Sequence, residues 1–292
     1  MRKEQHMKTF LENILMSVIL FLFLLVFARP LQATEPEFSY TPEVSVPITL
    51  IGLSAWAAGE WLKPQWVEGR DTRNWINPVD DAVRNALSWS VVHQDDAHIL
   101  SNIALGSIPV LASGLLFFAD DTGAAAPSVA RAKQTGMGAL ILLESASVAM
   151  LASQTIKFVV LRNRPYTRAD NYGASPTPDD HLSFYSGHTT VAFSLAVAGA
   201  NLHQMRKGRH PGLVWTVALG LATCVGYLRI AADKHYLSDV LVGALTGMAA
   251  GFLIPRYLHA TEKKDSGTQK STVAVFPVTT SNTWMLGFGF SF

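Results

Sequence analysis

The stretch Ser186-Gly-His-Thr-Thr-Val-Ala-Phe-Ser-Leu-Ala-Val-Ala-Gly-Ala-Asn-Leu-His-Gln-Met205 places a polar tripeptide directly before a long apolar run. Four further apolar stretches of similar length occupy residues 99–118, 136–156, 212–228 and 236–254. Apolar runs of this length are typical of helices that are buried in a bundle or in a membrane. We therefore expect an all-α, membrane-associated helical bundle.

The composition excludes several classes of protein. Apolar residues make up 49% and charged residues 15% of the 292 residues, which excludes intrinsic disorder. Lys+Arg 23 against Asp+Glu 22 leaves no basic excess, so nucleic acid is disfavoured as a partner. Cys224 is the single cysteine, so a disulfide scaffold and a cysteine-based zinc cluster are excluded.

The chain divides into four predicted regions. Residues 1–33 carry a basic start and a charge-free run, which predicts a signal peptide or an uncleaved N-terminal anchor. Residues 34–97 are expected to form a linker, a helix from Pro47 to Leu62 and a polar loop. Residues 98–258 form the predicted helical core. Residues 259–292 are predicted to be a linker and a short C-terminal β-hairpin, with strands at Val273–Val278 and Met285–Phe292.

Loop charges orient the predicted bundle. Three basic loops fall on one side if the five core stretches alternate in direction, and they contain Arg131 and Lys133, then Arg206, Lys207 and Arg209, then Arg256, Lys263 and Lys264. The positive-inside tendency makes that side cytoplasmic and the other side periplasmic. This orientation requires that the Pro47–Leu62 helix lies at the interface or packs on the bundle without spanning the membrane.

Three polar clusters lie at the ends of these apolar stretches. The first runs from Lys157 to Arg164-Pro165, the second is Ser183-Phe-Tyr-Ser-Gly-His-Thr189, and the third runs from Arg229 through His235 to Asp239. In an alternating bundle all three ends lie on the same side, so we expect them to converge. Charged groups beside a membrane core are costly, which favours a functional explanation.

The chemistry of the three clusters is complementary. Lys157, Arg164 and Arg229 are cationic donors suited to a phosphate. Ser186 and Gly187 stand at a helix N-terminus, which attracts an anion. His188 and His235 are candidates for an acid/base and a nucleophile. Asp239 follows His235 by four residues and so shares its helical face, where it can orient the imidazole ring.

The order Lys-x6-Arg-Pro, Ser-Gly-His, Arg-x5-His-x3-Asp resembles the three-part signature of the type 2 phosphatidic acid phosphatase family. That family includes lipid phosphate phosphatases, bacterial soluble acid phosphatases and vanadium haloperoxidases. Two positions depart from its usual pattern, because Tyr185 stands where a proline precedes Ser-Gly-His and Leu228 stands where a serine precedes the third-motif arginine. These changes leave the catalytic side chains in place but put the substrate range in doubt.

The resemblance implies a mechanism without a metal or a cofactor. His235 would attack phosphorus to form a phosphohistidine while Asp239 holds its ring. His188 would protonate the leaving oxygen and then activate water. The phosphoryl oxygens would be bound by the remaining motif residues, namely Lys157, Arg164, Ser186, Gly187 and Arg229.

The expected function is hydrolysis of a phosphate monoester or diphosphate, with a phosphorylated lipid favoured over a small phosphate ester and membrane lipid as surroundings. The expected location is the bacterial inner membrane, with the site facing the periplasm. Three alternatives stay open: a soluble periplasmic or outer-membrane-associated acid phosphatase, a vanadate-dependent haloperoxidase, and a membrane scaffold without turnover.

Other polar residues have simpler interpretations. We expect Arg162 and the Asp179-Asp180-His181 run to be solvated loop charges, with headgroup attraction as the alternative for Arg162 and metal binding as the alternative for the acidic run. We expect Glu144 to form a helix–helix hydrogen bond or to lie on a helix outside lipid. Helix capping is the more economical account of the cluster His93, Asp95, Asp96 and His98. Gly243, Gly247 and Gly251 recur every four residues, which predicts a face for close helix packing.

Overall fold

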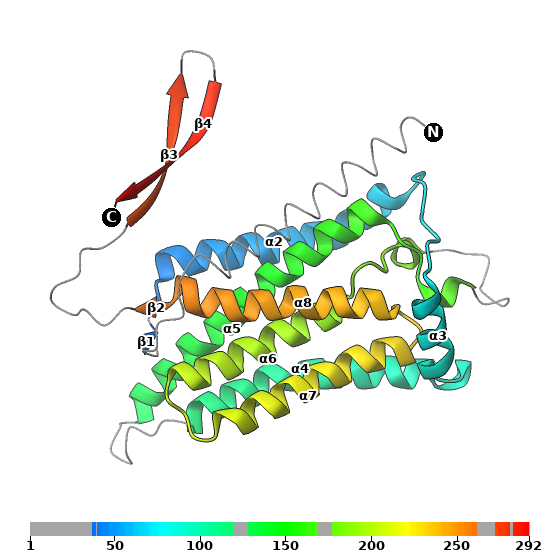
Figure 1. The fold of residues 1–292 in the computed structure, drawn as a ribbon, viewed down its shortest axis with the longest axis horizontal. Helices are drawn as coiled ribbons and strands as arrows, with labels where there is room; N and C mark the ends of the chain where they lie inside the picture. The colour runs from blue at the N-terminus through cyan, green and yellow to red at the C-terminus, as the bar shows by residue number, and fades with distance from the viewer. Residues whose placement is uncertain are drawn as a thin grey trace. The chain divides into compact units, whose positions relative to one another are not determined.

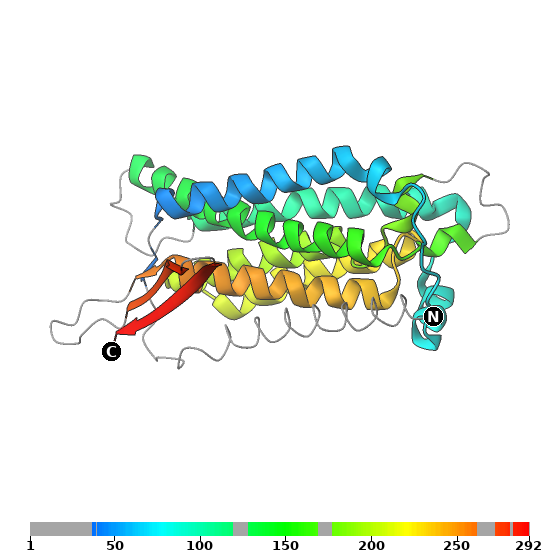
Figure 2. The same ribbon diagram turned by 90° about the horizontal axis from the view of Figure 1, so that it is seen from above.

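The computed structural model describes residues 37–38, 40–118, 128–168, 177–261, 272–280 and 283–291. Six long helices lie side by side in the larger of two units, residues 1–261 (Figures 1 and 2). They are α2 (Pro42–Val67), α4 (Gln94–Phe118), α5 (Ser128–Val160), α6 (Gly187–Met205), α7 (Pro211–Ala231) and α8 (Leu237–Leu253). The expectation of an all-α, membrane-associated bundle is confirmed. The predicted signal peptide or anchor at 1–33 lies outside the described residues.

Short elements join these helices. At the end where α4, α6 and α8 begin are α3 (Pro78–Leu87) and the 3₁₀ turns η1 (Val91–His93), η2 (Pro165–Arg168) and η3 (Pro178–His181). At the opposite end, α8 continues into the π-helical turn η4 (Ile254–Leu258). There β1 (Glu37–Phe38) pairs antiparallel with β2 (Ala260–Thr261).

Helix α6 is the centre of the bundle and packs against α4, α5, α7 and α8. Sixteen of its 19 residues are buried. The glycine stripe of α8 explains the closest of these contacts, because a Cβ on Gly243 would lie 2.8 Å from the Ser186 carbonyl oxygen. Added Cβ atoms on Gly247 and Gly251 would clash with the α6 carbonyls of Thr190 and Ser194. The predicted packing face is therefore confirmed.

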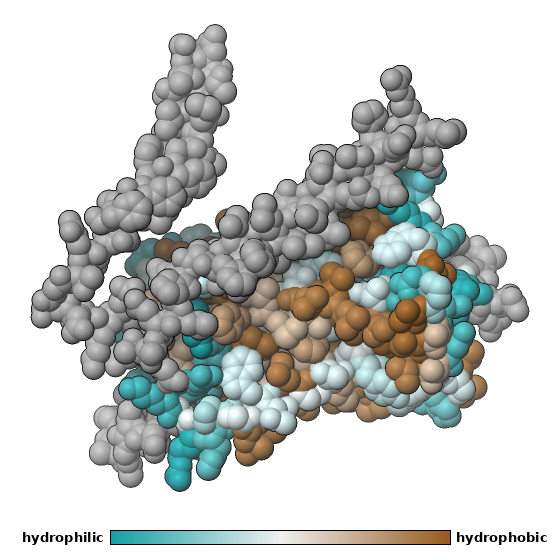
Figure 3. Space-filling model, in the orientation of Figure 1, coloured by the Kyte–Doolittle hydropathy of each residue, from teal (hydrophilic) through white to brown (hydrophobic). Residues whose placement is uncertain are grey.

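Four helical segments among the described residues are long and apolar enough to cross a membrane: Val91–Phe117, Ala132–Val160, Pro211–Ala231 and Leu237–Leu258. Large apolar side chains on α4, α7 and α8 are exposed, among them Val110, Val217 and Leu245. In Figure 3, hydrophobic residues gather over the middle of the visible face and hydrophilic residues lie toward its ends. This distribution is expected of a membrane protein.

Helix α2 is longer than the predicted Pro47–Leu62 helix and packs along α5. Two glycines two turns apart permit the approach, because a Cβ on Gly52 would lie 2.8 Å from Ser147 Cβ and one on Gly59 would lie 2.8 Å from Gln154 Nε2. The helix thus packs on the bundle, as one of the two predicted arrangements requires. It is not among the four segments that are apolar enough to span.

The smaller unit, residues 262–292, contains two strands, β3 (Thr272–Thr280) and β4 (Thr283–Ser291). They pair antiparallel in the register Thr272↔Ser291 to Thr280↔Thr283. The predicted strands thus correspond to two nine-residue strands with a short connection.

Candidate active site

The three motifs meet at one end of the bundle. Lys157 lies in the last turn of α5, Ser186 is the N-cap of α6, and Arg229 lies in the last turn of α7. A Cβ placed on Gly187 would lie 3.5 Å from Lys157 Nζ, so the first and second motifs are in contact. The Ser186 amide donates to the Asp239 carbonyl oxygen at 3.1 Å, which joins the second motif to the third.

His235 is 2% exposed and stands between α7 and α8. Its Nδ1 lies 3.6 Å from Asp239 Oδ2, within ion-pair range but longer than a hydrogen bond. Burial, followed by the nearby charges of Arg164, Arg229 and Lys157, holds the pKa of His235 well below its ordinary value. The imidazole is therefore neutral at neutral pH, the form that a nucleophile needs.

Arg164 is held by the loop that contains η3. Its Nε donates to the Asp179 carbonyl oxygen at 2.8 Å, and its Nη2 lies 3.3 Å from Asp179 Oδ2. Lys63 Nζ, from α2, lies 2.8 Å from Asp179 Oδ1. Burial alone would raise the pKa of Asp179, but Arg164 and Lys63 together hold it well below its ordinary value. A carboxylate therefore stands at the edge of the cationic cluster, and Lys63 is a neighbour that the motifs did not predict.

The first turns of α4 line the other side of the cluster. Arg229 Nη1 lies 2.6 Å from His98 Nδ1 and donates to Ser101 Oγ at 3.0 Å. His188 Nε2 lies 2.8 Å from Asn102 Oδ1. The sequence analysis did not predict Ser101 or Asn102, and it interpreted His98 as part of a cluster that caps a helix. The spacing of His98 and Asn102, one helical turn apart, is the signal that places both on one face.

The hydroxyl of Ser186 is engaged within its own helix. It accepts from the Thr189 amide at 3.4 Å and from Thr189 Oγ1 at 2.9 Å, and Ser186 is fully buried. This is the geometry of an N-cap, which satisfies an otherwise unpaired amide of the first turn. Its role as a phosphate ligand stays a prediction, as does that of Gly187.

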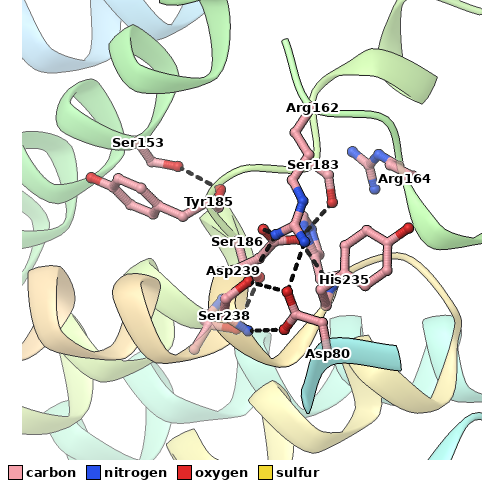
Figure 4. A network of polar contacts seen from close by, with 12 residues as sticks. Asp80, Ser153, Arg162, Arg164, Ser183, Tyr185, Ser186, His235, Ser238 and Asp239 are labelled. Atoms are coloured by element: carbon pink, nitrogen blue, oxygen red, sulfur yellow. Dashed lines mark hydrogen bonds and ion pairs between the residues drawn. The ribbon is translucent and has the colours of Figure 1, made fainter. Parts of the chain in front are cut away.

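The interpretation of Arg162 as a solvated loop charge is wrong. Its side chain is fully buried and forms ion pairs with Asp80 at 2.7 Å and Asp239 at 2.6 Å (Figure 4). The sequence gives no local sign of this, because both partners are about 80 positions away along the chain. A buried arginine needs such partners to offset its lost hydration.

The same correction applies to part of the acidic run in η3. Asp180 is 4% exposed and accepts from Tyr166 Oη at 2.5 Å and the Thr177 amide at 2.6 Å. Asp179 is half-exposed but paired. Elsewhere, Glu144 Oε2 lies 2.8 Å from His259 Nε2, and this buried contact links α5 to the residue that follows η4.

The two positions that depart from the family pattern are both packed. Tyr185 is 4% exposed, and its carbonyl oxygen accepts from Ser153 Oγ at 3.3 Å, which ties the second motif to α5. Leu228 is 6% exposed and packs with Ala97, Ala231 and Ala232. Leu228 therefore fills an apolar contact between α4 and α7.

Comparison with known proteins agrees with the motifs. The model of the PAP2 superfamily matches residues 138–263, a region that contains all three motifs and leaves α2, α3 and α4 outside. Phospholipid phosphatase 2 of Bos taurus is 35% identical over 91 residues, which cover 27% of this chain and 30% of that protein. The matched region thus spans less than a third of that relative.

Two solved structures are similar at low identity. One is the first transmembrane PAP2 type phosphatidylglycerolphosphate phosphatase from Bacillus subtilis, with a TM-score of 0.44, 20% identity, and coverage of 72% of this chain and 93% of that one. The other is Aquifex aeolicus LpxE, with a TM-score of 0.42, 19% identity, and coverage of 61% and 93%.

Proposed function

We propose that this chain, whose residues 138–263 match the model of the PAP2 superfamily, hydrolyses a phosphate monoester or diphosphate of a membrane lipid. The observation that carries the proposal is the convergence of a buried, neutral His235 with Lys157, Arg164 and Arg229. Three cations around one nucleophile match the charge of a phosphoryl group in its transition state.

The reaction follows from the position of each group. Because Asp239 faces Nδ1 of His235, Nε2 is the nitrogen that attacks phosphorus. A P–N bond forms as the bond to the leaving oxygen breaks, and His188 gives that oxygen a proton. His188 then takes a proton from water, which attacks phosphorus and releases phosphate and the free imidazole. Asn102 Oδ1 accepts from Nε2–H of His188 at 2.8 Å, so Nδ1 is the nitrogen that exchanges a proton with the leaving oxygen and with water. Burial, followed by the charges of Arg229 and His235, lowers the pKa of His188 to about 2 in the free protein, so the ring serves as the acid once a bound phosphate offsets these charges.

The lipid substrate is supported by the setting of the site. The cationic cluster lies at one end of a bundle with four candidate membrane-spanning segments. Arg206, at the opposite end, donates to the carbonyls of Leu116 and Gln134, so the basic loops gather away from the site. By the positive-inside tendency the site then faces the periplasm.

The direct test is phosphate release by the detergent-purified protein. The panel contains phosphatidic acid, phosphatidylglycerol phosphate, undecaprenyl diphosphate and soluble phosphate esters. We expect release from at least one lipid, loss of release in His235→Ala, and full release in His93→Ala, which removes an exposed imidazole at the same end. A wild-type protein that cleaves only soluble esters would contradict the lipid assignment, and an active His235→Ala protein would contradict the mechanism.

The intermediate has a separate test. Wild-type protein that is mixed with ³²P-labelled substrate and quenched rapidly in alkali should carry a label that acid removes, since a phosphoramidate is stable to base and labile in acid. His235→Ala should carry none. An acid-stable label would point to a different nucleophile.

A further inference from the structure

Arg162 is a fully buried cation that the proposed reaction does not use. Its Nη1 donates to Asp239 Oδ1 at 2.6 Å and to Ser238 Oγ at 2.8 Å. Its guanidinium lies between two aromatic rings, 4.2 Å from the centre of Trp75 and 4.1 Å from that of Tyr236. The arginine is therefore held in one orientation, with its donors directed at the carboxylate that faces His235.

The second carboxylate on Arg162 comes from Asp80, in α3. Asp80 Oδ2 accepts from Arg162 Nη2 at 2.7 Å and from Ser238 Oγ at 2.7 Å, while Oδ1 accepts from the Ser238 amide at 2.8 Å (Figure 4). Asp80 thus binds both the first-motif loop and the first turn of α8, at the residue directly before Asp239. Anions are stabilised at such a helix N-terminus.

Helix α3 also contacts the connection between α7 and α8 through Arg84, which follows Asp80 by one helical turn. Arg84 binds Asp233 with two bonds of 2.7 Å each. Asp233 precedes His235 by two residues and Ser238 follows it by three. Both ends of the segment that carries the nucleophile are therefore attached to α3, which lies outside the matched residues 138–263.

We infer that Asp80 and Arg162 are positioning residues that set the place and the effective charge of Asp239, and through it those of the His235 ring. This inference rests on the proposed function. Arg162 is shared by two carboxylates, so Asp239 keeps part of its negative charge for the imidazole. Without the Asp80 charge, Arg162 would neutralise Asp239 more completely, and the positive charge that develops on His235 would be less stabilised. Mutation of a residue that orients a functional side chain through a hydrogen bond typically lowers activity 10- to 100-fold.

The test compares Asp80→Asn and Arg162→Lys with Asp81→Asn in the full-length protein. Asp81 is the next residue of α3, and it pairs with Arg168 at 2.6 Å, with both side chains about 40% exposed. Asp81→Asn therefore removes an exposed ion pair from the same helix and leaves the side chains of Asp80, Arg162 and Asp239 unchanged. The measurements are kcat, KM and the inhibition constant of inorganic phosphate, with the best lipid of the panel as substrate.

We expect Asp80→Asn and Arg162→Lys to lower kcat by roughly 10- to 100-fold. KM and the inhibition constant of phosphate should change by less than about threefold, since Lys157, Arg164 and Arg229 are untouched. Wild-type kcat in both variants would overturn the inference, as would parallel losses of kcat and phosphate binding, which indicate a disordered site. A wild-type protein without phosphatase activity would instead overturn the proposed function.

Discussion

Arg162 and Arg164 stand two residues apart in the loop after α5, yet the two sides of this loop have opposite electrostatic character. On one side Arg162 is enclosed by Asp80, Asp239 and two aromatic rings. On the other, Arg164 faces a cluster of like charges and the half-exposed carboxylate of Asp179. A buried cation that is paired with carboxylates of the protein holds the fold together. A cluster of cations with too few carboxylates attracts an anionic ligand. The difference supports our proposal that Arg162 belongs to the framework and Arg164 binds the substrate.

The largest effect expected from this comparison concerns stability. Arg162→Ala would leave Asp80 and Asp239 buried without their cation, which costs about 3–5 kcal/mol. Unfolding in detergent, followed by heat or denaturant, measures the loss. Arg168→Ala breaks an exposed pair and should leave unfolding unchanged. Equal stability of the two variants would contradict the assignment of Arg162.

Arg164→Ala should affect activity in place of stability. We expect kcat/KM to fall by roughly 10²–10³, the usual effect of removing one donor to a developing negative charge. Phosphate release measures it, and Arg168→Ala again serves as the control. A variant that unfolds early but keeps its kcat/KM would reverse the roles given to the two arginines.

Asn102→Ala tests the α4 side of the cluster. Loss of the 2.8 Å contact to His188 Nε2 frees the ring to rotate and to change tautomer. We expect kcat to fall about 10-fold. Asn74→Ala, which removes an exposed amide contact to Asn163 at the same end, should keep wild-type kcat. Equal kcat values for the two variants would show that Asn102 has no role in the reaction.

The smallest effect is expected for Asp179→Asn. The carboxylate repels an incoming phosphate, so its neutralisation should lower KM by roughly threefold. Because Arg164 and Lys63 hold the pKa of Asp179 below its ordinary value, the group stays ionised and the effect should be constant between about pH 5 and 8. A higher KM would show instead that Asp179 mainly serves to hold Arg164.

Much of the site could be predicted from the sequence because its residues lie at the ends of recognisable apolar runs. Helices that alternate in direction bring Lys157, Ser186 and Arg229 to one end whatever their packing angles. The four-residue spacing of Gly243, Gly247 and Gly251 likewise predicted the packing face of α8. The contributions of Lys63, His98 and Asn102 were not predicted. The one-turn spacing of His98 and Asn102 places both on one face of α4, but only packing shows that this face, and Lys63 of α2, turn toward the cluster.

The helical class, the order of the three motifs and the two candidate histidines follow from the amino-acid sequence alone, since spacing along a helix is a local property. Which charges are solvated and which are enclosed becomes apparent only in the folded chain. Arg162 and Arg164 are the same residue type in the same loop, and their difference arises because α3 places Asp80 against one, while η3 presents the half-exposed carboxylate of Asp179 to the other. The free energy of a charge depends on what surrounds it in three dimensions, and the sequence around these arginines does not contain that information.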